Sequence, residues 1–255
     1  PHSSIIKYLC EKYDFALPKI YEDPDQAPDF PLISLAQNRL YSSRDQVSPE
    51  DPGPFKEYVK GPSKTMRQFI AFFSDQGDLI FYASARAFAQ YPLYIGSPSI
   101  LQTKSSLLDA ALLSMAKEVQ WRGFLSILTK EDPYTKKQYI LSIKNRPDNF
   151  TFLWQRAGLP LGKALLGLDL KKHKALPGQW GRLGQESYLA LAQHIRRGSF
   201  LDLPLSAYVP LRSFGPLWTL QDPGVAITYC SDTLEKAYQA FRTWRALRSK
   251  KSSMS

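Results

Sequence analysis

Apolar residues return every three or four positions in several segments of this chain. Met66, Phe69, Ile70 and Phe73 fall on one side of a helical wheel, and this spacing predicts an amphipathic helix over 63–76. Similar patterns, bounded by capping residues, glycine or proline, predict further helices. These are expected over residues 4–13, 78–90, 105–130, 148–158 and 185–197.

The last predicted helix has the clearest start signal. Asp232 can cap it, and Glu235 stands three residues later, where a capping box places it. Its apolar stripe is formed by Leu234, Ala237, Tyr238, Phe241, Trp244 and Leu247. A strand is expected at 136–144, where apolar and polar residues alternate. The stretch 93–101, LYIGSPSIL, is expected to be a loop or a short strand. The fold class predicted is therefore mainly α, an irregular helical domain with long loops and minor β at most.

The first 62 residues differ from the rest of the chain. They hold nine of its 19 prolines, which disfavour helices and central strands. We therefore expect residues 1–62 to form an extended, acidic arm with a short N-terminal helix, and residues 63–255 to form the helical domain. The apolar residues of the arm are expected to bind a protein partner: Ile20, Tyr21, Phe30, Leu32, Ile33 and Leu35.

Composition and charge refine this picture. A hydrophobic fraction of 44% with 13% aromatic residues indicates a packed protein. The net charge of +10 is unevenly distributed, because residues 136–255 hold 19 Lys and Arg against 7 Asp and Glu. One basic end predicts an anionic partner. The candidate contacts to lipid head groups or RNA phosphates are Lys171, Lys172, Lys174, Arg196, Arg197, Arg242, Arg245, Arg248, Lys250 and Lys251.

No motif of high specificity points to catalysis. The segment GLPLGKALLG at 158–167 departs from a phosphate loop, since only three residues separate its first glycine from Gly-Lys and Ala164 replaces the required hydroxyl. His2, His173 and His194 lack the close spacing of metal ligands. No catalytic residue, cofactor or metal is predicted, although Asp169, Glu186 and Asp202 leave a carboxylate pair open.

These observations favour a non-catalytic accessory subunit of a large mitochondrial assembly. The first choice is a membrane-associated energy-converting complex, an ATP synthase or a respiratory chain, in which the arm binds other subunits and the basic C-terminal helix contacts anionic, cardiolipin-like lipid. The alternative is a structural protein of the mitochondrial ribosome that binds rRNA. No apolar run reaches the roughly 18 residues of a membrane-spanning helix, so the expected location is the matrix or the surface of the inner membrane.

Overall fold

The fold is given by a computed structural model, which describes residues 2–21, 32–34, 39–41, 46–47, 54–91, 97–168 and 172–182. The chain divides into two compact units, Pro1–Ser213 and Phe214–Ser255. All described residues belong to the first unit, and the description below concerns that unit alone.

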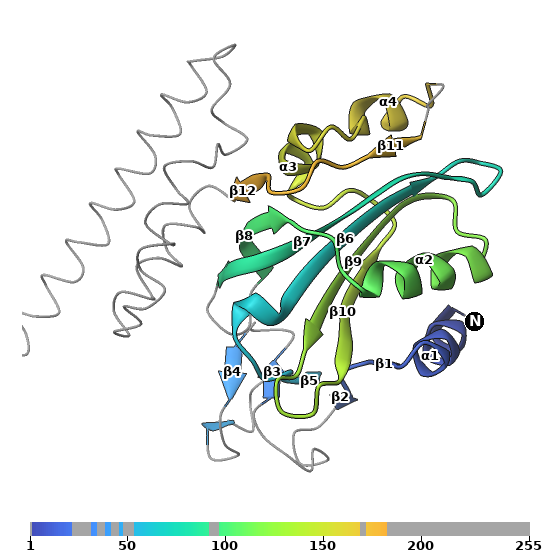
Figure 1. The fold of residues 1–255 in the computed structure, drawn as a ribbon. Coiled ribbons are helices and arrows are strands. Elements are labelled where there is room, and N and C mark those ends of the chain that lie inside the picture. Colours follow the sequence, from blue (N-terminus) through green and yellow to red (C-terminus); the bar gives the residue numbers. More distant parts are fainter. Residues whose placement is uncertain are drawn as a thin grey trace, which may run out of the picture. The chain divides into compact units, whose positions relative to one another are not determined.

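A mixed eight-stranded sheet forms the centre of the unit (Figure 1). Its strand order is β1-β10-β9-β6-β7-β8-β12, with β11 paired to β7. Neighbours along this order are antiparallel except for β1, which runs parallel to β10, and β11 is parallel to β7. The strands are β1 Phe15–Ala16, β6 Met66–Phe73, β7 Leu79–Tyr91, β8 Ser97–Thr103, β9 Gly123–Glu131, β10 Gln138–Lys144, β11 His173–Lys174 and β12 Trp180–Arg182.

The prediction of a mainly α fold is wrong, and the segments around β6 and β7 show why. Met66 and Ile70 pack on one face of the sheet, whereas Phe69 and Phe73 pack on the other. A central strand covered on both faces carries apolar residues at consecutive positions, so a helical period appears in its sequence by coincidence. The predicted helices over 63–76 and 78–90 are therefore two antiparallel strands.

The predicted helix over 105–130 ends much earlier. Helix α2 covers Leu108–Glu118, and the chain then turns into β9. Gln120 and Gly123 both have positive φ, 51° and 75°, which a continuing α-helix does not allow. The predicted strand over 136–144 is confirmed as β10, and the predicted N-terminal helix is confirmed as α1, His2–Lys12.

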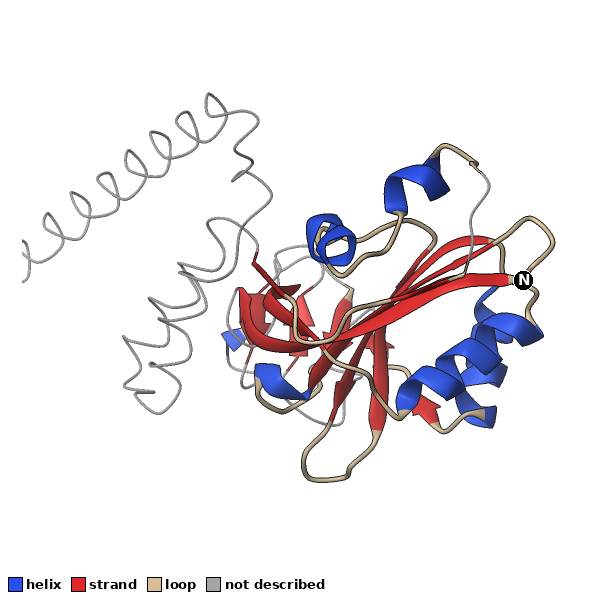
Figure 2. Ribbon diagram, turned by 45° about the horizontal axis from the view of Figure 1, so that its top comes forward, coloured by secondary structure: helices blue, strands red, loops and turns tan. Residues whose placement is uncertain are grey.

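Helices cover both faces of the sheet (Figures 1 and 2). Helices α1 and α2 pack on one face, around Phe69, Leu125 and Ile127. On the other face lie α3, Thr151–Arg156, and α4, Leu161–Leu165. Each face thus has its own hydrophobic core, and the central strands belong to both.

The proline-rich arm does not stay extended throughout. Parts of it form a separate four-stranded sheet of order β2-β5-β3-β4, with β2 Ile20–Tyr21, β3 Leu32–Ser34, β4 Arg39–Tyr41 and β5 Phe55–Glu57. Leu32 and Phe55 form its small core. A 3-10 turn, Ser63–Thr65, then leads into β6, so the small sheet is connected directly to the centre of the large one.

Candidate functional site

A buried lysine lies where the small sheet meets the large one. Lys130 stands near the end of β9, opposite Met66 of β6, and only 2% of the residue is exposed. Because side chains alternate along a strand, Lys130 shares the face of Phe124, which packs in the α3 and α4 core. The position is therefore a lysine on a largely apolar sheet face.

The environment of the Lys130 ammonium gives it little compensation for lost hydration. Its Nζ lies 5.0 Å from the centroid of the Tyr58 ring, a cation–π contact. Within the described part of the chain, no carboxylate lies within 4.0 Å of it. Burial lowers the pKa of Lys130 to about 8, and the negative charge of Asp132 only partly opposes this. Strongly shifted pKa values cluster at functional sites, which makes Lys130 a candidate site residue.

Lys56, on the neighbouring strand β5, adds a second cation at the same junction. Its Nζ donates a hydrogen bond of 3.0 Å to the carbonyl of Leu141, at the point where the β9–β10 register shifts. Burial lowers the pKa of Lys56 as well. Lys56 of β5 thus contacts β10, and Tyr58, the residue after β5, contacts Lys130 of β9. We call Lys56, Tyr58 and Lys130 the lysine junction.

Further along the same sheet face lies a chain of buried and half-buried polar groups. The Gln68 amide donates to the Ser126 hydroxyl at 2.8 Å. Asp148, just beyond β10, accepts bonds from the Trp154 indole at 2.9 Å and the Phe150 amide at 2.7 Å. Burial raises the pKa of Asp148, although these two hydrogen bonds favour the carboxylate. This network orients Trp154 and begins α3.

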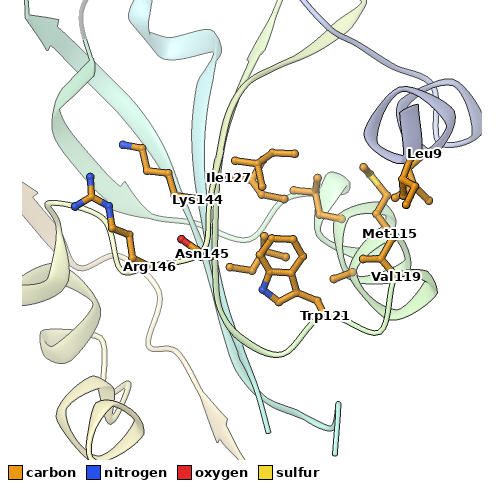
Figure 3. Close-up of a pocket in the computed structure, with 13 residues that line it drawn as sticks. Leu9, Met115, Val119, Trp121, Ile127, Lys144, Asn145 and Arg146 are labelled. Carbon is orange, nitrogen blue, oxygen red and sulfur yellow. The ribbon is translucent and has the colours of Figure 1, made fainter. Parts of the chain in front are cut away.

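The opposite face of the sheet contains an apolar pocket of about 650 Å³. Helix α1 contributes Leu9, the α2 region contributes Met115 and Val119, and Ile127 of β9 forms part of its floor (Figure 3). Trp121 also lines it, held by a 2.9 Å bond from its indole nitrogen to the carbonyl of Phe124.

The polar residues of this pocket are confined to one segment. Lys144, Asn145 and Arg146 line the pocket where β10 ends, and the two cationic side chains extend away from its apolar residues (Figure 3). All three are exposed. The pocket therefore combines an apolar interior with a basic rim.

The structure describes only two of the predicted anion contacts. Lys172 and Lys174 are exposed, and Lys174 lies in β11. The others lie outside the described residues: Lys171, Arg196, Arg197, Arg242, Arg245, Arg248, Lys250 and Lys251. Binding of an anion by these groups stays a prediction.

The residues predicted to bind a partner are divided in a similar way. Phe30 and Leu35 lie outside the described residues. Leu32 is buried in the core of the small sheet, and Tyr21 packs against it. Ile20 is 59% exposed and Ile33 is partly exposed. A protein partner and a mitochondrial location stay predictions.

The described chain offers neither a reactive thiol nor a metal-binding cluster. Cys10 is buried in α1, and burial together with the charge of Glu11 raises the pKa of its thiol to about 11, so the reactive thiolate is scarce at neutral pH. The described residues contain no group of three or more His, Cys, Asp or Glu side chains able to hold a metal ion. In the same part of the chain, no helix has the length and apolarity to cross a membrane.

No family model matches the sequence, and no curated protein matches it. Several solved structures resemble the fold. The biotin carboxylase domain of Hydrogenobacter thermophilus 2-oxoglutarate carboxylase, solved with MgADP and bicarbonate, aligns with a TM-score of 0.49 and 11% identity over 69% of this chain and 47% of that one. The N5-carboxyaminoimidazole ribonucleotide synthetase of Thermus thermophilus aligns with a TM-score of 0.48 and 12% identity over 68% of this chain and 53% of that one.

A third similarity extends over a much smaller part of its counterpart. Rhizobium etli pyruvate carboxylase aligns with a TM-score of 0.44 and 13% identity over 64% of this chain but only 17% of that one. The chain thus spans about half, or less, of the length of these enzymes.

These findings correct three expectations from the sequence. The mixed eight-stranded sheet contradicts a mainly α protein. The solved structures that resemble the fold are carboxylases and synthetases, so they do not support the expected non-catalytic accessory subunit of an energy-converting complex or its ribosomal alternative. The expectation that the chain is not an enzyme likewise finds no support in these structures, which are enzymes.

Sequence reasoning also missed the lysine junction. It searched for local motifs and for clusters of charge, whereas Lys56 and Lys130 are isolated lysines on strands of two different sheets. One signal was present in TKEDPYTKKQY, where Asp132-Pro133 stands between two apolar runs. Such a turn predicts a hairpin, and a hairpin would have placed Lys130 at the end of a buried strand.

Proposed function

We propose that the chain is part of an enzyme that binds a phosphate- or carboxylate-bearing small molecule at the lysine junction. The observation that carries the proposal is Lys130, a cation that is 2% exposed and has no carboxylate within 4.0 Å among the described residues. An uncompensated buried charge destabilises a protein. An anion beside it supplies the missing compensation.

The geometry suggests distinct roles for the three residues. Lys130 supplies positive charge in a site of low dielectric, where its attraction for an anion is strongest. Lys56 is anchored by its bond to the Leu141 carbonyl and retains further N–H donors for a ligand oxygen. Tyr58 holds the Lys130 side chain in place through its ring. With a pKa of about 8, Lys130 can also exchange a proton near neutral pH.

A divalent metal does not fit the described residues of this face, because they provide no cluster of metal-binding side chains. Lys56 and Lys130 alone would then balance the negative charge of the ligand. ADP, the ligand named for the Hydrogenobacter thermophilus structure, belongs to the proposed class of anions and is the first compound to test. Comparing the affinity for inorganic phosphate with the affinity for citrate shows whether the site prefers phosphate or carboxylate.

Calorimetric titration of the full chain with each anion tests the proposal. We expect Lys130→Met to weaken binding by about tenfold or more, as for loss of a buried charge-assisted contact. The matched control is Lys137→Met, an exposed lysine on the same hairpin, which should change affinity less than about twofold. Affinity should also fall as the pH rises through about 8, because Lys130 loses its charge. Equal affinities for Lys130→Met and the wild type would contradict the proposal.

A further inference from the structure

The apolar pocket under α1 and α2 is a second site, independent of the lysine junction. The two lie on opposite faces of the large sheet, since Ile127 of the pocket floor packs with the α1 and α2 core and Lys130 shares the other face with Phe124. We propose that this pocket binds a free long-chain fatty acid, with the hydrocarbon chain inside and the carboxylate at the basic rim.

The interior of the pocket fits a hydrocarbon. Its volume of about 650 Å³ falls within the range of roughly 300–1,000 Å³ found for small-molecule sites. Leu9, Met115 and Ile127 are each at least 95% buried, and they border the pocket together with other apolar residues of α1, α2 and β9 (Figure 3). Each methylene transferred from water into such an interior strengthens binding by about fourfold, so chain length governs affinity.

The rim determines which end of the ligand stays outside. Lys144, Asn145 and Arg146 are the polar residues of the lining, and they are consecutive, so polar groups meet the ligand at one end. Arg146 makes no ion pair within 4.0 Å in the described part of the chain. Long cationic side chains can turn toward a carboxylate held at the mouth. Two cations beside an apolar interior match an anionic amphiphile better than a neutral lipid.

The two helices that cover the pocket provide an entrance. Near the end of α1, Lys12 donates to both oxygens of Glu118 at 2.8 Å, and Tyr13 donates to Glu118 at 3.0 Å. This end of α1 is thereby fastened to the last residue of α2. Ile5, one turn before Leu9, also lines the pocket and is 47% exposed. We infer that a single hydrocarbon chain enters at this exposed Ile5 end of α1.

The test is titration of the full-length protein with sodium oleate below its aggregation concentration, followed by calorimetry, with methyl oleate as the uncharged comparison. Saturable binding of one oleate per chain is expected, and methyl oleate should bind about tenfold more weakly because it lacks the charge-assisted contact. Val119→Trp places a large ring in the pocket and should abolish binding. Arg146→Glu should weaken oleate binding by about tenfold, while Lys172→Glu, on an exposed lysine outside the lining, should leave it unchanged.

Two results would overturn the inference. One is oleate binding at wild-type affinity in both Val119→Trp and Arg146→Glu, each with an unfolding temperature near that of the wild type. The other is absence of oleate binding while vesicles of anionic phospholipid bind the wild type and Arg146→Glu differently, which would assign the rim to a membrane surface. If Val119→Trp fails to fold, the comparison of Arg146→Glu with Lys172→Glu decides the matter by itself.

Discussion

The Nζ atom of Lys130 lies 5.0 Å from the centroid of the Tyr58 ring, and no described carboxylate lies close enough to form an ion pair with it. Desolvation sets its pKa near 8 against an ordinary value of 10.5. The folded protein therefore binds fewer protons than the unfolded chain between pH 8 and 10.5. Stability should rise through this interval as the pH increases.

Replacement of Lys130 by methionine should remove that dependence. At pH 7 the variant is expected to be more stable than the wild type by up to about 3 kcal/mol, the equivalent of the pKa shift. The difference should shrink above pH 8 and vanish near pH 10.5. Urea unfolding at pH values below, within and at the upper end of this interval measures it. A parallel stability profile for the two proteins would show that Lys130 is not desolvated as described.

Asp148 provides the opposite case, because burial raises the pKa of an acid by penalising its charged form. The wild type should lose stability as the pH rises from about 3.8, its ordinary value, toward the raised value. In Asp148→Asn the oxygen that accepts from Trp154 and Phe150 is retained, and this pH-dependent loss should disappear. As the pH rises above 3.8, the free energy of unfolding of the variant should therefore increase relative to that of the wild type. A constant difference up to neutral pH would count against the buried carboxylate.

The contact between α1 and α2 can be tested through Glu118. The negative charge of Glu118 strengthens the hydrogen bonds that it accepts from Lys12 and Tyr13, and the bond from Lys12 lowers the pKa of Glu118. Glu118→Gln should increase amide hydrogen exchange in α1 while leaving β6 and β9 unchanged. The same increase should appear in the wild type as the pH falls below the lowered pKa. Unaltered exchange in α1 would mean that hydrophobic packing alone holds the helix.

Close packing between β12 and α3 makes Gly181 a sensitive position. A Cβ at Gly181 would stand 2.8 Å from the Cβ of Leu153 and 3.2 Å from the Phe152 ring. Gly181→Ala is expected to destabilise the fold by about 1–3 kcal/mol, the usual effect of overpacking. Gly162→Ala in α4 is the matched control, since nothing lies within 4 Å of its added methyl group, and it should be neutral or slightly stabilising. Similar thermal unfolding of both variants would contradict this packing.

The elements that the sequence predicted correctly are those with local signals. Helix α1 precedes a proline-rich segment, and β10 has clear alternation around Ile143. Strands β6 and β7 were missed because both of their faces are covered, which removes the alternation that identifies a strand. The helices that cover each face are distant from β6 and β7 in sequence. The local sequence of these strands therefore does not indicate that both faces are buried.

The candidate sites were hidden for a related reason. Lys56 and Lys130 belong to different sheets, and the pocket joins residues of α1 with the end of β10. Charge counting drew attention to dense basic runs such as Lys171 to Lys174, of which the described part is exposed. An isolated lysine becomes conspicuous only when its burial is known, and burial depends on tertiary structure.

The parallel pairing of β1 with β10 constrains the order of folding. Phe15 pairs with Gln138, and Ala16 with Tyr139, although most of the described chain separates them. During synthesis β1 has no partner until the β9–β10 hairpin has left the ribosome. Contacts of such long sequence separation slow folding, so closure of this edge is expected to be a late step. A protein stalled before residue 138 would lack the β1–β10 pairing that ties the segment after α1 to the edge of the sheet.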